Sequence, residues 1–353
     1  MKHLVKKIFL LISAVAVVAC SGEEELPDVP VVPDDGGILY ILNAGDWKSN
    51  NSSLTMYNTS TGESVQNFFE LRNGRCLGNN ANDMLVYGGK MYIAVAGEGT
   101  IEVTDLDARS IKQIECGAEP RSLVAHGGKV YASYFNGYVA RVDTFSLEVD
   151  AKVKVGRNPE RMDVCGGKLF VANSGGMDYN TEVGYDNTVS VIDLASFTEI
   201  DRLEVVINPA NVVSDGKGVF VVSYGNYADI PSTLQYFSSG GVSCVLPDAC
   251  RNMTEICYNS GVLYGFCSQY DQNWNPTITY MSYDAANGIV GECWIEDGNL
   301  PLSPYKICSA GNYVCVTSSD YINDGDVYLY DTDGFRVSVV PAGLNPVKVV
   351  RVE

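Results

Sequence analysis

The sequence predicts an all-β fold in which seven similar four-stranded sheets close into a ring. Three observations lead to this expectation. Apolar runs recur at a nearly regular spacing, tight turns separate them, and the two ends of the chain each hold part of one unit. Together these features predict a seven-bladed β-propeller closed by the C-terminal strand.

The clearest repeat unit spans residues 117–143. Its apolar runs at 122–125, 130–134 and 138–142 alternate in the manner of half-buried strands, and a fourth run follows at 148–155. A Gly-Gly-Lys turn separates the first two runs and an Asn-Gly turn separates the next two, as expected of tight hairpins. We therefore expect four consecutive antiparallel strands in each unit, named A to D in chain order.

An aromatic residue in strand B marks the period in six copies, and Cys315 takes its place in the last copy. This position recurs every 39 to 52 residues, close to the roughly 40–50 residues typical of four-stranded propeller blades. A proline precedes it by eleven residues in four copies, namely Pro120, Pro159, Pro209 and Pro304. The seven strand B positions are Tyr40, Tyr92, Tyr131, Phe170, Phe220, Tyr264 and Cys315. Tyr40, Tyr92, Tyr131 and Trp294 are expected to be core residues within strands.

The chain ends predict ring closure. Residues 345–352 form a strand A with no strand B after it, whereas residues 38–42 form a strand B with no strand A before it. A shared first blade made from both ends protects strand edges that an open array would expose. We expect residues 36–353 to form one propeller domain.

Residues 1–19 have the pattern of an export signal. Three lysines precede the apolar run at 8–19, which is too short to span a membrane as a helix. Residues 17–20, Val-Val-Ala-Cys, resemble the bacterial lipobox, which implies lipidation of Cys20. The alternative is an ordinary secretory signal followed by a chance cysteine.

Residues 20–35 are rich in proline and acidic side chains and lack periodicity, so they are expected to form a tether. Ser21 and the three glutamates at 23–25 resemble the outer-membrane and surface-export signals of some lipoproteins. The expected location is therefore the outer membrane, with the lipid as the membrane contact and the protein exposed at the cell surface.

Composition argues against several kinds of function. The formal net charge of −19 repels nucleic acid and anionic lipid surfaces. The 11 cysteines show no C-x-x-C spacing, so no metal site is expected. Export permits disulfides, but their pairing is left open. The acidic stretch at 320–326 is expected to form a turn rather than a calcium site.

Histidine usage predicts that the protein is not an enzyme. The chain has 2 histidines, and His3 leaves with the signal. His126 lies at an A-to-B turn, and no carboxylate pair is singled out by its spacing. No catalytic residue is therefore proposed.

The long connections predict where a ligand binds. Because successive strands alternate direction, the B-to-C and D-to-A connections share one face of the ring. The A-to-B turns are short, whereas B-to-C connections are long in five blades, at 46–53, 173–187, 224–232, 268–276 and 318–325.

Large aromatic and amide side chains concentrate on this face, which favours a recognition surface over an ordinary loop. Individual rings could instead plug the channel or pack between blades. Arg121 and Arg161 could bind a ligand or pair with acids of neighbouring blades. Tyr224 and Tyr305 lie on the same connections. The candidate ligand-binding residues are Trp47, Asn50, Asn82, Asp83, Arg121, Phe135, Arg161, Tyr179, Tyr185, Tyr227, Tyr270, Trp274 and Tyr321.

The connections also carry a family resemblance. The segments are ILNAGDWKSNNSSL at 41–54, NGRCLGNNANDM at 73–84, VGRNPE at 155–160, VANSGGMDY at 171–179, YGNYADIPSTL at 224–234 and SQYDQNWNPTI at 268–278. They resemble the YncE-like propeller lipoproteins, and among these the BtuG-type surface proteins that capture vitamin B12 and related corrinoids beside a TonB-dependent transporter.

The resemblance implies a surface lipoprotein that binds cobalamin or cobinamide and passes it to a TonB-dependent outer-membrane barrel. A corrinoid is a wide, flat macrocycle edged with amides, which suits aromatic planes interleaved with amide side chains. Capture would use the periphery of the corrinoid macrocycle and not its cobalt, because His126 is expected on the opposite face of the propeller. The resemblance implies no resident cofactor. The alternative is a surface propeller that binds a glycan, a peptide or a partner protein.

Overall fold

The computed structural model describes residues 36–250, 252–270 and 276–352, without the side chains of Tyr270 and Pro276. The expected signal sequence, Cys20 and the tether lie outside this part of the chain, as does Trp274. Within it, no helix combines the length and the apolar character needed to cross a membrane.

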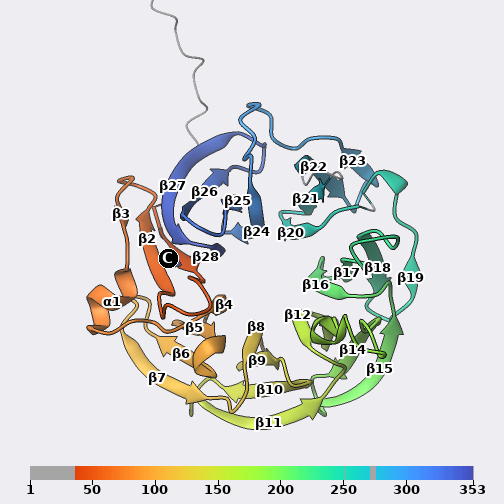
Figure 1. The fold of residues 1–353 in the computed structure, drawn as a ribbon, viewed down its shortest axis with the longest axis horizontal. Helices are drawn as coiled ribbons and strands as arrows, with labels where there is room; N and C mark the ends of the chain where they lie inside the picture. Colours follow the sequence, from red (N-terminus) through yellow and green to blue (C-terminus); the bar gives the residue numbers. More distant parts are fainter. Residues whose placement is uncertain (1–35, 251, 271–275, 353) are drawn as a thin grey trace, which may run out of the picture. The chain divides into compact units, whose positions relative to one another are not determined.

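The described residues form seven four-stranded antiparallel sheets arranged in a ring (Figure 1). The seven-bladed β-propeller predicted from the sequence is confirmed. Strands A to D run from the channel outwards in each blade, and in the repeat unit they lie within a residue or two of the expected bounds.

The first four blades contain the following strands. Blade 1 contains β28 (Pro346–Val352), β1 (Ile38–Asn43), β2 (Ser53–Asn58) and β3 (Ser64–Val65). Blade 2 contains β4 (Ala81–Tyr87), β5 (Lys90–Val95), β6 (Thr100–Thr104) and β7 (Ser110–Glu115). Blade 3 contains β8 (Pro120–His126), β9 (Lys129–Tyr134), β10 (Tyr138–Asp143) and β11 (Glu148–Lys154). Blade 4 contains β12 (Pro159–Cys165), β13 (Lys168–Asn173), β14 (Thr188–Asp193) and β15 (Thr198–Glu204).

The remaining three blades have the same order. Blade 5 contains β16 (Pro209–Ser214), β17 (Gly218–Ser223), β18 (Thr233–Ser238) and β19 (Ser243–Cys244). Blade 6 contains β20 (Glu255–Asn259), β21 (Val262–Tyr270), β22 (Pro276–Asp284) and β23 (Ile289–Gly291). Blade 7 contains β24 (Pro304–Ala310), β25 (Tyr313–Ser318), β26 (Asp324–Tyr330) and β27 (Arg336–Leu344).

The C-terminal strand closes the ring. Strand β28 is the innermost strand of blade 1 and pairs antiparallel with β1, with Ile38 opposite Val352 and Leu42 opposite Lys348. The pairing continues past the strands, because the Ala44 N–H donates to the Asn345 carbonyl at 2.9 Å. Both ends of the propeller domain therefore contribute to one sheet.

Apolar side chains fill the spaces between neighbouring blades. Tyr40, Tyr92 and Tyr131 lie in strands β1, β5 and β9 and are buried, as expected. Trp294 is also buried, but it follows β23 rather than lying in a strand, which corrects the expectation. Its ring packs edge-on against Tyr264, and its indole N–H donates to the Gly265 carbonyl at 3.2 Å. An irregular segment can be buried here because its polar group has a partner.

The described residues also contain four short helices that were not expected from the sequence. They are α1 (Phe68–Asn73), η1 (Ala96–Glu98), η2 (Gly176–Asp178) and η3 (Asp248–Cys250). Helix α1 ends at Gly74, whose φ of 66° suits glycine and whose N–H bonds the Glu70 carbonyl. Phe68 and Phe69 are buried between blades 1 and 2. Six residues are too few to show a clear helical period in the sequence.

A β-bulge follows the first residue of most innermost strands. The register shifts between Pro120 and Ser122 in β8, and shifts at the corresponding place occur in β4, β12, β16 and β24. A proline suits the first position because it has no N–H to donate to the sheet. A bulge changes the direction of the adjacent side chains, and the residues after these first positions line the pocket described below.

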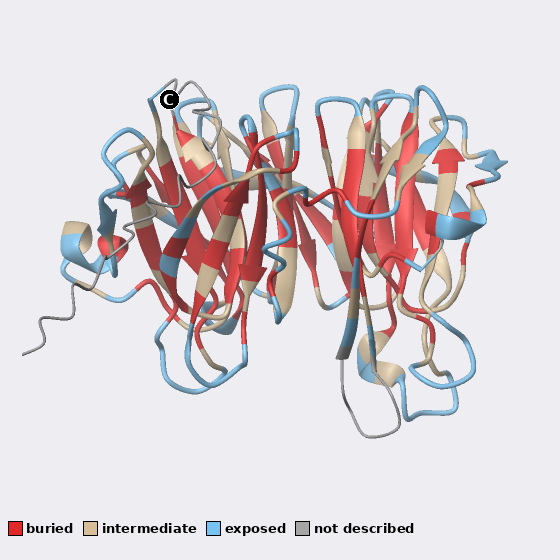
Figure 2. Cartoon of the chain, turned by 90° about the horizontal axis from the view of Figure 1, so that it is seen from above, coloured by how far each residue is buried: buried red, intermediate tan, exposed pale blue. Residues whose placement is uncertain are grey.

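The two faces of the ring differ as expected. Residues from both D-to-A and B-to-C connections line one pocket, which confirms that these connections share a face. Exposed His126 ends β8, whereas Pro120 on the pocket side begins it, so the histidine lies at the opposite face. Figure 2 shows the ring from the side, with buried strands between two layers of exposed connections.

Candidate functional site

A pocket of about 410 Å³ lies at the face that carries the long connections. Its floor comes from the starts of the innermost strands, and its rim comes from the B-to-C connections. The lining residues are Trp47, Asn82, Arg121, Phe135, Glu160, Arg161, Ser174, Gly176, Met177, Tyr185, Asn208, Ala210, Asn211, Tyr224, Tyr227, Glu255, Tyr305, Lys306 and Val347.

Arg121 is held by three neighbours on one side of the pocket. Its guanidinium donates to Glu160 Oε2 from Nε at 3.0 Å and from Nη2 at 2.7 Å, and Nη1 donates to Asn82 Oδ1 at 3.3 Å. The guanidinium also lies 4.8 Å from the centre of the Phe135 ring. These contacts fix the side chain in place while leaving it on the pocket wall.

Glu255 and Lys306 form a second ion pair on the other side. Lys306 Nζ donates to Glu255 Oε1, and the Tyr224 hydroxyl donates to the same oxygen at 2.8 Å. Burial alone would raise the pKa of Glu255, but the charges of Lys306 and Arg161 lower it below the ordinary value. Burial is also the main cause that lowers the pKa of Lys306, with Glu255 opposing it. Burial and the nearby Glu255 carboxylate raise the Tyr224 pKa well above 10, so this phenol is neutral at physiological pH.

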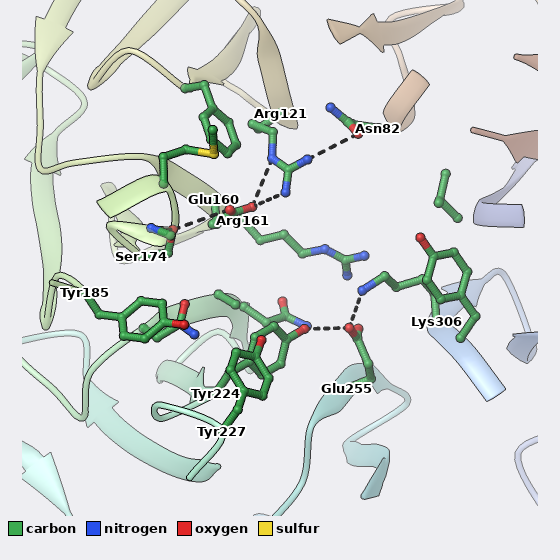
Figure 3. Close-up of a pocket in the computed structure, with 18 of the residues that line it drawn as sticks. Asn82, Arg121, Glu160, Arg161, Ser174, Tyr185, Tyr224, Tyr227, Glu255 and Lys306 are labelled. Carbon is green, nitrogen blue, oxygen red and sulfur yellow. Dashed lines mark hydrogen bonds and ion pairs between the residues drawn. The ribbon is translucent and has the colours of Figure 1, made fainter. Parts of the chain in front are cut away.

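Arg161 extends into the pocket between these two pairs (Figure 3). Within the part of the chain that the structure describes, its guanidinium has neither a hydrogen bond nor an ion pair. Burial alone would lower the pKa of Arg161, but the carboxylates of Glu255 and Asp83 raise it, so the group is positively charged. It is the one arginine of the pocket lining without a carboxylate partner among the described residues.

Tyrosine rings form the rim. Tyr227 is 75% exposed, and its ring centre lies 6.3 Å from that of Tyr224. Tyr185 lines the pocket and stacks on Tyr179 at 6.5 Å with an interplanar angle of 28°. Trp47, from blade 1, also lines the pocket and is 74% exposed. Exposed aromatic planes around a concave site are typical of a surface that binds an apolar or flat ligand.

Two buried polar groups of the lining have free hydrogen-bonding capacity. Neither amide atom of Asn211, a residue that is 2% exposed, has a partner among the described residues. The same holds for Glu255 Oε2, whereas Oε1 is fully engaged with Lys306 and Tyr224. Buried polar groups in native proteins nearly always have partners, so these atoms are available to a ligand or to water.

The structure brings seven of the candidate residues together in the pocket. These are Trp47, Asn82, Arg121, Phe135, Arg161, Tyr185 and Tyr227. Tyr224 and Tyr305, from the same connections, also line it. The open question about the two arginines has a different answer for each, because Arg121 pairs with an acid of the next blade and Arg161 does not.

The other candidates lie elsewhere. Asp83 is buried and accepts hydrogen bonds from the Ser122 hydroxyl at 3.0 Å and the Leu123 N–H at 2.9 Å, so it joins β4 to β8. Asn50 lines a smaller, separate hollow beside Phe69. Tyr179 contacts Tyr185, and Tyr321 packs edge-on against Tyr305 at 5.4 Å, so both extend the rim. The Tyr270 side chain and Trp274 lie outside the described residues.

Sequence reasoning did not identify most of the floor. The missed lining residues are Glu160, Ser174, Gly176, Met177, Asn208, Ala210, Asn211, Glu255, Lys306 and Val347. Several occupy the first or second position after the proline that begins an innermost strand. That position was available as a signal, because the prolines recur in register with the repeat.

The described residues do not offer a metal centre. No group of three or more histidine, cysteine, aspartate or glutamate side chains gathers among them in a way that could hold an ion. Their ten cysteines are free thiols. At 320–326, Asp320 Oδ1 accepts the Ile322 and Asn323 N–H groups at 2.9 and 2.7 Å, which makes the expected turn.

Comparison with known proteins places the fold among natural propellers. No family model and no curated protein sequence matches the chain. A candidate 6-phosphogluconolactonase from Bacteroides fragilis NCTC 9343 is 13% identical with a TM-score of 0.62, over 91% of this chain and 99% of that one. A candidate 6-phosphogluconolactonase from Bacteroides uniformis ATCC 8492 is 13% identical with a TM-score of 0.62, and the match covers 90% of this chain and 100% of that one. Apo AztD from Citrobacter koseri is 12% identical with a TM-score of 0.51, over 90% and 98%. At these identities the likeness shows the β-propeller fold alone.

Proposed function

We propose that this protein is a cell-surface lipoprotein that captures corrinoids, such as cobalamin and cobinamide, at the pocket face of its propeller. The observation that carries the proposal is the pocket itself, in which exposed tyrosine and tryptophan planes surround a floor of amide and guanidinium groups. The resemblance of the long connections to the BtuG-type proteins supplies the ligand class.

The shape and chemistry of the pocket suit one edge of a corrinoid. A pocket of about 410 Å³ holds part of so large a macrocycle, and the exposed rings of Trp47 and Tyr227 extend the contact surface beyond it. The peripheral amides of a corrinoid both donate and accept hydrogen bonds. Asn82, Asn208 and Asn211 on the lining offer matching amide groups.

The proposed role is binding and delivery rather than catalysis. Histidine is not among the lining residues, and the two glutamates of the lining are each paired with a cation. A carboxylate held in an ion pair is a poor general base because its charge is already stabilised. Lipidation at Cys20 would hold the ring at the outer membrane, where a TonB-dependent barrel would take up the released ligand.

Co-elution with a coloured ligand tests the proposal. Protein starting after Cys20 is mixed with cobalamin or cobinamide and desalted, and binding is quantified by calorimetry. We expect the protein fraction to carry the visible absorbance of the corrinoid with one ligand per chain. A colourless protein fraction with both corrinoids would contradict the proposal, and retention on immobilised glycans or peptides would then support the alternative binding role.

A further inference from the structure

The pocket lining carries one more cation than its acidic side chains neutralise. Arg121 is paired with Glu160 at 2.7 Å, and Lys306 is paired with Glu255. Arg161 has no such partner among the described residues, although it extends between the two pairs. The lining therefore has a local positive excess within a chain whose formal net charge is −19.

Neighbouring acids do not supply the missing partner. Asp83 and Glu255 are close enough to raise the Arg161 pKa, but neither forms an ion pair with it among the described residues, and Glu255 Oε2 has no partner there. Asp83 is paired with Lys348 at 3.5 Å and accepts the Ser122 and Leu123 donors, whereas Glu255 Oε1 accepts from Lys306 and Tyr224. The nearby tyrosines do not act as anions, because burial raises the pKa of Tyr224 and raises that of Tyr305 to about 12.

A second donor lies on the next innermost strand. Asn211, on β16, is buried on the lining, and its amide N–H groups have no acceptor among the described residues. Arg161 lies on β12, which packs against β16. A half-buried guanidinium without a carboxylate and a buried amide without an acceptor would each gain from an anionic oxygen ligand.

We propose that the floor of this pocket is an anion subsite, in which Arg161, assisted by Asn211, binds one carboxylate or phosphate group of a ligand whose apolar part rests on the tyrosine rim. Arg161 is suited to this role because a guanidinium binds planar carboxylate or phosphate oxygens through two parallel N–H groups. Lys306 and Arg121 are each neutralised by their own glutamate, so they do not compete with Arg161 for those oxygens.

This inference does not depend on corrinoid capture, so it is tested with other probes. Two matched pairs of small molecules are used, benzoate with uncharged benzamide and phenyl phosphate with uncharged phenol. Each pair keeps the aromatic ring and changes the charge. The thermal unfolding midpoint of the propeller is measured against probe concentration at fixed ionic strength, for the parent protein, Arg161→Gln, Arg161→Lys and Arg202→Gln. Arg202 is a control on outer strand β15, where it pairs with Glu199.

At least one anionic probe should raise the midpoint of the parent with a saturable concentration dependence, because a ligand bound to the folded state stabilises it. Its uncharged partner should have a much smaller effect. Arg161→Gln should remove the difference within each pair, Arg161→Lys should keep part of it, and Arg202→Gln should leave it unchanged. The pair that responds tells whether the group is a carboxylate or a phosphate.

Three results would each overturn the inference. These are equal effects of charged and uncharged probes on the parent, an unchanged response in Arg161→Gln, and no response to any probe. If Arg161→Gln does not fold by circular dichroism, the paired comparison in the parent and in Arg161→Lys decides. Corrinoid co-elution is measured separately, so the failure of one proposal leaves the other standing.

Discussion

Arg121 and Glu160 join the innermost strands of neighbouring blades at the wall of the pocket. Arg121 on β8 donates from Nε at 3.0 Å and from Nη2 at 2.7 Å to the same Glu160 oxygen on β12. The Ser174 hydroxyl donates to the other oxygen at 3.4 Å. The pair is partly shielded from water, with side-chain exposures of 28% and 17%, so it can contribute to stability as well as to the pocket wall.

Replacing Glu160 with glutamine should therefore weaken the joint between blades 3 and 4. The substitution keeps the shape and removes the charge that Arg121 needs, so the free energy of unfolding should fall by about 1–2 kcal/mol. Urea denaturation measures the change. The control is Glu148→Gln, whose carboxylate is 72% exposed and lies 3.5 Å from Lys112. That variant should change the free energy by less than about 0.5 kcal/mol, and an equal loss in both variants would contradict the assignment.

Ring closure predicts that the C-terminal strand is essential. Removing residues 345–353 takes away β28, exposes the edge of β1 and uncovers apolar side chains such as Val349, which is 0% exposed. An exposed strand edge favours aggregation, and the lost burial lowers stability. We expect the truncated protein to aggregate or to lose cooperative thermal unfolding.

A circular permutant is the matched control for this truncation. Because Val352 lies opposite Ile38, residues 345–353 can be moved in front of Gly36 through a short Gly-Gly-Lys turn like those of the other blades. The permutant should regain cooperative unfolding. A truncated protein that melts like the parent would contradict the role of β28.

Lowering the pH should weaken the contribution of Glu255 to the stability of the fold. Its pKa is lower in the folded protein than the ordinary 4.5, because Lys306 and Arg161 oppose the effect of burial. A group with a lowered folded pKa stabilises the fold above its unfolded pKa, and that stabilisation is lost as the pH falls through the folded pKa. The parent should therefore be more stable than Glu255→Gln at neutral pH, and the difference should shrink as the pH falls below 4.5. Chemical denaturation at several pH values measures it, and a difference that grows on acidification would contradict this sign.

The expected location of the protein at the membrane follows from the predicted lipidation of Cys20. The substitution Cys20→Ala should prevent lipidation and release the protein from the membrane fraction, because the lipid is the expected membrane contact. Fractionation and metabolic labelling with a fatty acid measure the effect. Substitution of Ser21 by alanine is the control and should leave the label in place. A Cys20→Ala protein that still fractionates with membranes would contradict the lipobox interpretation.

The repeat made the architecture predictable from the sequence. Alternating runs, Gly-Gly-Lys turns and prolines eleven residues before the strand B aromatic identify four strands in each unit. The B-to-C connections of blades 1, 4, 5 and 7 lie between the expected strands to within two residues. In blade 6, β21 extends to Tyr270 and β22 begins at Pro276, so strands occupy both ends of the connection expected at 268–276. These features were recognisable because each depends on local sequence, namely turn chemistry and a period of two.

The floor of the site was not predictable in the same way. Glu255 lines the pocket because it begins β20 at the channel, and Lys306 reaches it from blade 7. Their pairing depends on ring geometry that joins residues 51 positions apart. Trp294 was expected in a strand, but contacts with three tyrosines bury it in an irregular segment.

The most direct measurement of the central claim is the affinity for cobalamin of variants on the two faces. Trp47→Ala and Tyr227→Ala remove exposed aromatic planes from the pocket rim, whereas His126→Ala changes an exposed residue on the opposite face. Each rim substitution should weaken binding by about 1–4 kcal/mol in calorimetry, with little change in the unfolding midpoint, and His126→Ala should bind like the parent. Unchanged affinity in both rim variants, or a loss confined to His126→Ala, would contradict capture at this face.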